Sequence, residues 1–379
     1  MTQKIGSVFT RIKNGATIKQ SEYASGIPIT RIQTISNGVV DRNKFGYADI
    51  GDPGDYADYI LQDGDILMSH INSLDHLGKC AIYFSKPDEI VIHGMNLLVL
   101  RCDRSVIDPW FALRYFQSSQ FKRFITRIAK KSVNQASFSI ADLKKISIPT
   151  PSLSTQRKIA ALIASIDMLR ESYSILERDL DHLVKSRFIE MFGDELTQCV
   201  VPLSDACQLF TDGDWIESKD QSKTGIRLIQ TGNVGNGKYL NKSSNARYIS
   251  EETFEKLKCT EVRPGDLLIS RLPHPVGRCC IIPEGLGRAI TAVDCTILRL
   301  NRGWEPQFIL WFTKTDGYQN QISNYLTGTT RKRISRSNLG KILVPKIASN
   351  RQLEFSLFAE EVDKLRFDCE WASALLSKR

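Results

Sequence analysis

The stretch of this sequence that comes nearest to a chemical motif is TGNVGNGKY, at residues 231–239. Its outer glycines and Lys238 have the spacing of a phosphate-binding loop, G-x-x-x-x-G-K-[ST], and the apolar run at 226–229 could be the strand before it. The last residue of such loops is a serine or threonine that binds magnesium, whereas Tyr239 stands here. A nucleotide-binding enzyme is therefore one hypothesis, with a misfit at the metal position.

Other catalytic patterns do not occur in the sequence. The five histidines form no H-E-x-x-H pair, the nine cysteines include no C-x-x-C pair, and there is no G-x-S-x-G elbow. We therefore expect no metal on this chain, and reduced cysteines that pack as small apolar side chains. His70 and His274 follow the similar stretches GDIL and GDLL, which suggests paired loops that contact a ligand.

Composition and charge indicate a globular chain with a polyanionic partner. The 379 residues are 42% hydrophobic and 25% charged, and no window approaches the roughly 18 apolar residues of a membrane span. No signal-peptide core follows the first residue, so we expect a cytoplasmic protein and no membrane partner. Residues 1–155 hold 19 Lys and Arg against 14 Asp and Glu, and residues 193–349 hold 21 against 16. The net charge of +9 thus lies in two equal blocks, which favours nucleic acid.

The two basic blocks belong to an internal repeat. ITRIQTIS at 29–36 is echoed by IRLIQTGN at 226–233, DGDILMS at 63–69 by PGDLLIS at 264–270, GKCAI at 78–82 by GRCCI at 277–281, LLVLRCDR at 97–104 by CTILRLNR at 295–302, and ADLKKISIPTPSLSTQRKI at 141–159 by SNLGKILVPKIASNRQLEF at 337–355. Solenoid repeats run about 20 to 50 residues, so a unit of this length is a whole domain with an attached element. We infer one α+β unit used twice.

Each copy is expected to hold short strands followed by a helix. Apolar and β-branched runs predict strands at 27–35, 65–71, 79–84 and 91–101 and a helix at 109–130 in the first copy, and strands near 226, 266, 277 and 290 and a helix at 306–325 in the second. SEETFEKLK at 250–258 predicts a capped helix that the first copy lacks.

A long helix follows each globular copy. Apolar residues recur there at heptad spacing, which predicts two helices that pair as an antiparallel coiled coil with pseudo-twofold symmetry. The predicted seam comprises Ile159, Leu162, Ile166, Leu169, Tyr173, Leu176, Leu180 and Leu183 in the first helix, and Phe355, Phe358, Val362, Leu365, Cys369, Ala372 and Leu376 in the second. The alternative is that each seam packs on its own globular copy. Arg187 takes the next seam position, where we expect the seam to fray, bend or meet another protein.

Side chains suited to DNA gather at matching places in both copies. KKSVNQASFS at 130–139 and LTGTTRKRISRS at 326–337 both lie between the last helix of the domain and the run that leads to the long helix. Arg and Lys bind guanine or phosphate, Asn and Gln bind adenine, and Ser and Thr bind phosphate. We predict DNA contacts by Lys130, Lys131, Asn134, Gln135, Thr329, Thr330, Arg331, Lys332 and Arg333. A solvated, unliganded charge run is the alternative.

These features together resemble the specificity subunits of type I restriction-modification systems. DLKKISIPTPSLSTQRKIAALIASID, followed by a helix that ends SRFIEMFGD, resembles the conserved helical region of that family, and IPITRIQTIS and DGDILMS resemble its target recognition domains. The resemblance implies recognition domains at 1–150 and 194–346 and conserved helices at 151–193 and 347–379. The second helix begins VPKIASNRQ, without the second proline, which puts partner docking there in question more than the fold.

The resemblance implies a subunit without catalysis that reads a bipartite, asymmetric target on double-stranded DNA, one half-site per recognition domain. It implies two methyltransferase subunits docked on the conserved helices, and restriction subunits in the full complex. We expect no cofactor on this chain, with S-adenosylmethionine, ATP and magnesium only on the partners. A purely structural coiled-coil adaptor and the nucleotide-binding enzyme are the alternatives.

The matched strands extend the set of predicted DNA-facing residues. Three places contribute further residues: the stretch RIQT and its copy, the turn after that copy, and the ends of the strands GDIL and GDLL. The added residues are Arg31, Gln33, Thr34, Ser69, His70, Asn72, Arg227, Gln230, Thr231, Asn233, Lys238, Ser270, Arg271 and His274. The Gly-Asp pairs are expected only to shape turns. ISNGVVDRN, the first copy's counterpart of TGNVGNGKY, lacks the lysine, which favours a turn after a DNA-facing strand over a nucleotide site.

Overall fold

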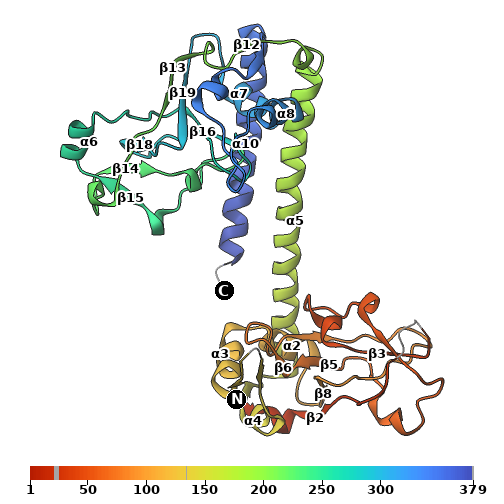
Figure 1. The fold of residues 1–379 in the computed structure, drawn as a ribbon. Coiled ribbons are helices and arrows are strands. Elements are labelled where there is room, and N and C mark those ends of the chain that lie inside the picture. Colours follow the sequence, from red (N-terminus) through yellow and green to blue (C-terminus); the bar gives the residue numbers. More distant parts are fainter. Residues whose placement is uncertain (21–24, 134, 378–379) are drawn as a thin grey trace. The chain divides into compact units, whose positions relative to one another are not determined.

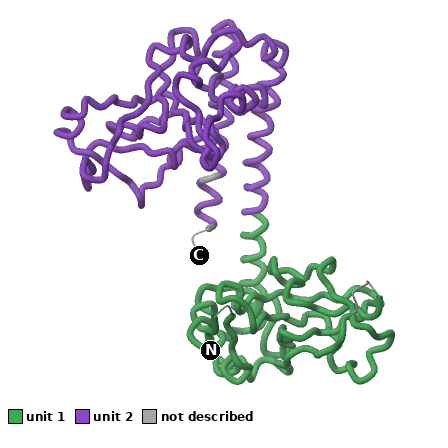
Figure 2. The backbone as a smooth tube through the Cα atoms, in the orientation of Figure 1, with its two compact units in different colours: residues 1–169 green, residues 170–379 purple. Residues whose placement is uncertain are grey.

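The computed structural model describes residues 1–20, 25–133 and 135–377, which form two compact units, 1–169 and 170–379 (Figures 1 and 2). The boundary falls inside the long helix α5 (Leu153–Phe192), so that its first part belongs to unit 1 and its second part to unit 2. Unit 2 also contains α10 (Ser349–Ser377). A long helix after each globular copy was predicted and is confirmed.

The same four-stranded antiparallel sheet forms the centre of both units. Its strand order in unit 1 is β2 (Phe9–Asn14), β8 (Leu97–Cys102), β5 (Ile66–Ser69) and β7 (Cys80–Ile82). In unit 2 the order is β13 (Cys207–Asp212), β19 (Cys295–Leu300), β16 (Leu267–Ser270) and β17 (Cys279–Ile281). Even the irregularities recur, since β2 and β13 each shift register near their first residue. The α+β class and the internal duplication are therefore confirmed.

The helix that follows each sheet is broken in two, where one helix was predicted. Unit 1 has α2 (Pro109–Phe116) and α3 (Ser119–Ile128), and unit 2 has α7 (Pro306–Phe312) and α8 (Asp316–Asn324). Ser118 and Thr315 cause the breaks, because their hydroxyls accept hydrogen bonds from backbone N–H groups of the new first turn. The two apolar helices cover one face of the sheet in each unit.

Smaller strands build a second layer. In unit 1, β3 (Ile27–Ile29) pairs with β4 (Gly46–Ala48); in unit 2, β14 (Ile226–Ile229) lies between β15 (Arg247–Ile249) and β18 (Ala289–Thr291). The predicted strand at 27–35 is thus too long, because a 3-10 turn, η1 (Ile32–Ile35), follows β3. Unit 2 contains the predicted capped helix α6 (Glu251–Leu257), whereas the corresponding part of unit 1 forms the 3-10 turn η3 (Gly54–Tyr59).

A pair of terminal strands and short helices closes each unit beside the long helix. Strand β1 (Thr2–Lys4) pairs with β11 (Ser147–Pro149), and β12 (Cys199–Pro202) pairs with β20 (Leu343–Pro345). The short helices are α1 (Ile5–Val8) and α4 (Ile140–Lys145) in unit 1 and α9 (Arg336–Gly340) in unit 2. All nine cysteines are free thiols, as the sequence suggested.

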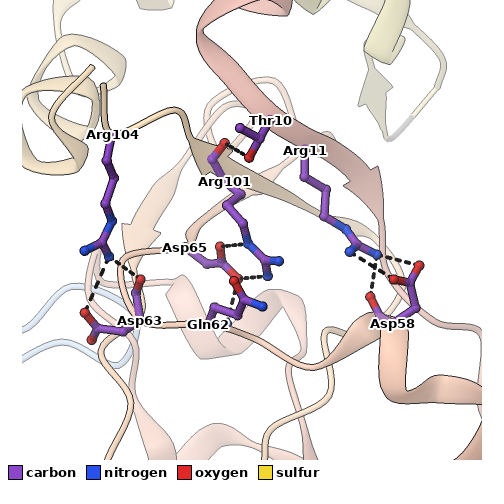
Figure 3. A network of polar contacts seen from close by, with 8 residues as sticks. All are labelled: Thr10, Arg11, Asp58, Gln62, Asp63, Asp65, Arg101 and Arg104. Atoms are coloured by element: carbon purple, nitrogen blue, oxygen red, sulfur yellow. Dashed lines mark hydrogen bonds and ion pairs between the residues drawn. The ribbon is translucent and has the colours of Figure 1, made fainter. Parts of the chain in front are cut away.

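The Gly-Asp pairs shape turns, as predicted, and also hold a buried ion pair (Figure 3). Asp65 is 1% exposed and accepts two hydrogen bonds from the Arg101 guanidinium, of 2.8 and 2.7 Å, and a third from the backbone of Gln62. Asp266 and Arg299 form the same pair in unit 2, at 2.9 and 2.7 Å. In each copy this ion pair joins the turn before one central strand, β5 or β16, to the neighbouring central strand, β8 or β19.

A buried glutamine joins each globular domain to its long helix. The Gln156 amide oxygen accepts from the backbone N–H of Asp108 at 2.8 Å, and its nitrogen donates to the carbonyls of Val106 and Pro151 at 2.9 and 2.8 Å. In unit 2, Gln352 accepts from Glu305 and donates to Ile347. Both glutamines are 0% exposed. This role explains why a glutamine stands at the same place in both helix starts.

Within unit 2, α10 packs antiparallel against residues 170–192 of α5. The contacts run in opposite directions along the two helices: Arg187 pairs with Glu354, and Asp181 with Arg366. The aromatic rings of Phe188 and Phe192 lie 5.1 and 5.7 Å from that of Phe355. The predicted antiparallel pairing is therefore present in this unit, and Arg187 continues the contact by an ion pair.

The residues that make this contact agree with the predicted seam only in part. On the part of α5 that belongs to unit 2, the buried residues are Leu180, Val184, Phe188 and Phe192, which recur every four residues. Leu176, Leu183 and Leu365 are 43%, 49% and 55% exposed, although the heptads place them in the seam. Large aromatic rings fill the interior of unit 2 here, so the helix turns its i, i+4 face inward instead of a strict heptad face. In unit 1, Ile159, Leu162 and Leu169 are also exposed, at 36%, 62% and 49%.

The other seam positions are mostly covered. Phe355, Val362 and Cys369 are buried, and Phe358, Ala372, Leu376, Tyr173 and Ile166 are partly exposed. None of the helices in the described part of the chain is both long enough and apolar enough to cross a membrane.

Candidate nucleic-acid interface

In unit 1 a small three-stranded sheet brings two predicted DNA-binding segments together. Its order is β6 (Ile71–Asn72), β10 (Ala136–Ser137) and β9 (Lys130–Lys131), with Asn72 opposite Ala136 and Ala136 opposite Lys131. The turn between β9 and β10 closes by a hydrogen bond from the backbone N–H of Ser132 to the carbonyl of Gln135. The lysines and Gln135 are exposed, while Asn134 lies outside the described residues. Segments about 60 residues apart in sequence therefore form one polar surface.

In unit 2 the matching segments also lie together. The basic loop closes as a tight hairpin, because Thr327 and Arg333 exchange two backbone hydrogen bonds of 2.9 Å. The next residue, Ile334, donates its backbone N–H to the carbonyl of Arg271. Thr329, Thr330, Arg331 and Lys332 line one side of a cavity of about 600 Å³, and Pro273, His274 and Pro275 line another. The basic loop and the end of β16 thus face a common hollow.

The basic side chains of these two hairpins form no ion pair among the residues that the structure describes, although the pKa of the Asp142 carboxyl is lowered by Ser139 and Lys145 and, slightly, by the nearby Lys130. No ion pair there involves Lys130, Lys131, Arg331, Lys332 or Arg333, and all five are exposed. Some basic residues elsewhere in unit 1 do form ion pairs: Asp58 binds both Arg11 and Lys13, and the Arg11 guanidinium and Lys13 ammonium lower the pKa of its carboxyl to about 2. Figure 3 shows the contact between Asp58 and Arg11. Both hairpins therefore present exposed positive charge that no described ion pair neutralises.

Some predicted DNA-facing residues have roles inside the fold instead. Thr34 is buried, and its hydroxyl accepts the Arg31 N–H at 2.9 Å and donates to the carbonyl of Lys44. Asn233 is buried as well, and its amide accepts the Gln230 N–H at 2.9 Å and donates to Leu240. Both residues cap a 3-10 turn, so neither side chain is available to a duplex.

These matching caps correct the alignment of the two copies at this point. Thr34 corresponds in structure to Asn233, and Arg31 to Gln230, whereas the sequence match of IQT pairs Thr34 with Thr231. The carbonyls of Thr34 and Asn233 also accept matching hydrogen bonds, from Asp41 and Leu240. The IQT identity is therefore a coincidence shifted by two residues, because capping chemistry rather than sequence identity fixes this turn.

Of the remaining candidates at these turns, Gln33 is exposed, whereas Arg31, Gln230 and Thr231 are partly exposed. The Arg31 guanidinium donates to the side chain of Gln20. Arg227 is 6% exposed and lies over the ring of Tyr248, at 5.6 Å. Gln33 is thus the most accessible of the group.

The predicted residues at the ends of the central strands also divide into buried residues and residues at the surface. Ser69 and Ser270 are almost fully buried. His70 is 8% exposed beside Phe138, and burial lowers the pKa of its imidazole. The Arg271 guanidinium donates to the carbonyls of Ile334 and Val293 and so supports the basic loop from within. His274 is exposed, whereas Asn72 is partly exposed, and its amide donates to the Ser69 hydroxyl at 3.3 Å and accepts the backbone N–H of Ser73 at 2.8 Å.

The stretch TGNVGNGKY does not form a phosphate-binding loop. Thr231–Asn233 is a 3-10 turn, η6, and Val234 then pairs with Tyr239 in a tight hairpin, where such a loop would open a helix. The Tyr239 hydroxyl is buried. Lys238 lines a cavity of about 310 Å³ with Asp181 and His182 of α5, and no residue of the basic loop lines this cavity. The nucleotide-binding hypothesis is therefore not supported.

Metal chemistry was not expected either. Within the described ranges, no group of three or more His, Cys, Asp or Glu side chains is placed to hold a metal ion.

Sequence comparison relates part of the chain to a known family. Residues 1–172 match the family model of the type I restriction modification DNA specificity domain. The chain is 42% identical over 167 residues to a putative type I restriction enzyme MjaX specificity subunit of Methanocaldococcus jannaschii, covering 44% of this chain and 39% of that protein. It is 24% identical over 196 residues to the type I restriction enzyme EcoKI specificity subunit of Escherichia coli, covering 50% and 42%. The match thus spans about two fifths of each relative.

Two solved structures share the fold over the whole chain. One is the S subunit of a type I restriction-modification system from M. genitalium, with a TM-score of 0.59 and 13% identity, covering 100% of this chain and 92% of that one. The other belongs to a study of complex assembly and conformational transition of the type I R-M system, with a TM-score of 0.57 and 16% identity, covering 100% and 94%. At these identities the likeness concerns the fold.

Proposed function

Because residues 1–172 match the model of the type I restriction modification DNA specificity domain and unit 2 repeats their fold, we propose that this chain is the DNA-reading specificity subunit of such a system. It reads a bipartite, asymmetric target on double-stranded DNA, with one half-site per globular domain, and carries out no chemistry itself. We keep the four-part division at 1–150, 151–193, 194–346 and 347–379 as part of this proposal. A cytoplasmic location is part of the same proposal.

The observation that carries the proposal is the same surface built twice. In each unit an unpaired basic hairpin lies beside the end of a central strand, at β9–β10 and β6 in unit 1 and at the basic loop and Pro273–Pro275 in unit 2. Lysine and arginine bind phosphates through charge, and amide side chains such as those of Asn72 and Gln135 bind base edges. Two copies on one chain suit two half-sites.

Within each surface we assign phosphate contacts to the exposed basic and hydroxyl residues, and base contacts to the amide and imidazole residues that are exposed or, for Asn72, partly exposed. The residues assigned to phosphate contacts are Lys130, Lys131, Thr329, Thr330, Arg331, Lys332 and Arg333. The residues assigned to base contacts are Gln33, Asn72, Gln135 and His274, together with Asn134, which is proposed from the sequence alone. Thr34, Ser69, Asn233 and Arg271 are assigned to the support of these surfaces.

The long helices are proposed to carry the partner subunits. Leu176, Leu183 and Leu365 are apolar seam residues of unit 2 that stay exposed, and α10 exposes Phe367 and Trp371 as well, at 67% and 61%. Exposed apolar and aromatic residues in a row mark protein-binding surfaces. Two methyltransferase subunits and, in the full complex, restriction subunits are the partners that the family suggests, and S-adenosylmethionine, ATP and magnesium would be bound by them.

A binding assay tests the DNA role. Duplex affinity of the full chain is measured from about 50 to 200 mM salt for the wild type, for R331E/K332E/R333E and for K130E/K131E. The control is K144E/K145E, two adjacent exposed lysines on α4 of unit 1. Each lost phosphate contact should flatten the slope of log K against log salt by about 0.9. Slopes of both hairpin variants equal to that of the control would refute the assignment.

A further inference from the structure

Arg278 lies inside unit 2 and binds four backbone carbonyls. Its side chain is 8% exposed; Nε donates to Val234 at 2.7 Å, Nη1 to Leu272 and Pro275 at 2.6 and 3.1 Å, and Nη2 to Thr231 at 2.8 Å. The two groups of acceptors belong to two separate turns, one after β14 and the other after β16. The planar guanidinium suits this task because its donors form a fixed fork.

A buried arginine without a carboxylate needs a reason. Removing a guanidinium from water costs several kcal/mol per ion, and carbonyl dipoles offset this cost only when the donors are well satisfied. Burial lowers the pKa of Arg278, in agreement with an environment that lacks a counter-charge. An apolar residue would fill the space at lower cost but would make none of these four hydrogen bonds. The cation therefore serves to hold the two turns together.

Both turns belong to the proposed DNA surface or support it. The turn after β16 carries His274, which is exposed and lines the hollow opposite the basic loop. The turn after β14 carries Gln230 and Thr231, which are partly exposed. Among the described contacts of the Leu272–Pro275 turn, the two to Arg278 are the ones that join it to the turn after β14. The position of the His274 segment relative to Gln230 depends on one side chain.

The first copy has a basic residue at the same place with a simpler role. Lys79 takes the position of Arg278 in GKCAI, and its ammonium donates to the carbonyl of Ser36 at 3.0 Å. Ser36 follows the turn η1, so the basic residue holds the corresponding turn in both copies. Lys79 thus binds one turn in the first copy, whereas Arg278 in the second copy binds two turns through the several N–H donors of its guanidinium.

We propose that Arg278 is a positioning residue that sets the half-site specificity of unit 2, by fixing the turn of His274 against the turn of Gln230. This inference rests on the proposed DNA-reading function. It predicts that loss of the fork alters discrimination at one half-site, while affinity for unrelated DNA and reading of the other half-site stay the same.

The test is a selection from a randomised duplex library with the full chain, followed by affinities for the enriched duplex and for duplexes with either half scrambled. R278K keeps a cation, as in the first copy, but cannot hold both turns; R278M removes the charge. We expect R278K to lose about tenfold or more of the discrimination at one half-site. R299K is the matched control, because Arg299 is partly buried in the same unit but binds Asp266 instead of the two turns.

Hydrogen exchange gives a second measurement that needs no DNA. In R278K, peptides covering 229–235 and 271–277 should both exchange at least severalfold faster than in the wild type, whereas R299K should leave the second peptide unchanged. The proposal is overturned if R278K keeps both half-site ratios within twofold of the wild type, or if the two peptides exchange as before. If the wild type enriches no sequence at all, the DNA-reading function itself fails, which the exchange data distinguish from a failure of the fork.

Discussion

Replacing Gln156 with leucine should loosen the joint between the first globular domain and its long helix. Gln156 is fully buried, and its three hydrogen bonds reach the start of α2 and the turn before α5. Leucine has a similar size but pairs with none of these groups. A buried hydrogen bond contributes about 1 kcal/mol net, and an orphaned backbone group costs about 1–3 kcal/mol, so we expect a loss of roughly 3 kcal/mol. Replacing Gln352, which makes two such bonds, should lower the free energy of unfolding of unit 2 by about 2 kcal/mol.

Hydrogen exchange followed by mass spectrometry is the suitable assay, because it reports the opening free energy of each unit separately. In Q156L, peptides covering 104–112 and 150–160 should lose protection by about two orders of magnitude, and peptides of unit 2 should not change. Q120L is the control, since Gln120 is an exposed residue of α3 in the same unit. Equal protection in Q156L and Q120L would show that the glutamine does not hold the joint, and that its recurrence in both copies has another cause.

Three further predictions test the fold and the rejected alternative. Burial lowers the pKa of the His93 imidazole to about 4, below its unfolded value near 6.5. The free energy of unfolding of unit 1 should therefore be highest above pH 6.5 and fall as the pH drops towards 4, because folding then disfavours the proton that the unfolded chain binds. Unfolding measured across this pH range should show that H93Q removes about 3 kcal/mol of this fall. D266N should lower the stability of unit 2 by about 3 kcal/mol in urea unfolding, because it breaks a buried ion pair, whereas E284Q, at an exposed acidic residue, should not. Equilibrium dialysis with labelled ATP should show no retention that K238A abolishes; such retention would restore the nucleotide-binding hypothesis.

The duplication and the broad architecture could be predicted from sequence because apolar periodicity and repeated segments are local signals. Strands at 66–69, 80–82 and 97–102 follow runs of β-branched and apolar residues, and α6 follows a capped, acidic first turn. Strands β2 and β13 carry mixed polar residues at a sheet edge, so no alternation marks them. The helix breaks at Ser118 and Thr315 depend on a single hydroxyl each, which a helical pattern conceals.

The candidate site could be predicted only in part. Residue type predicted the two hairpins, because runs of lysine, arginine and amide residues are rarely buried and carry the groups that bind DNA. Residue type could not separate Thr34 and Asn233, which cap turns, from exposed residues of the same chemistry. Arg278 was not among the predicted site residues, and its signal was the match of Lys79 and Arg278 in GKCAI and GRCCI, whose meaning depends on the carbonyls around it.

The heptad pattern also shows what a helical seam can and cannot reveal. It located both long helices and their antiparallel contact in unit 2, but the aromatic pair Phe188 and Phe192 rotates α5 so that Leu176 and Leu183 stay exposed. A sequence pattern gives the apolar face of a helix, whereas the packed face depends on which neighbouring side chains fill the interior.

The central claim is that this chain selects a bipartite DNA target, one half with each globular domain. The most direct measurement is the map of methylated adenines in cells that express the methyltransferase partner, with this gene present, deleted, or carrying residues 1–150 from a relative. We predict that one bipartite motif loses its methylation on deletion, and that the exchange changes one half of the motif and leaves the other. An unchanged methylation map in both strains would contradict the claim.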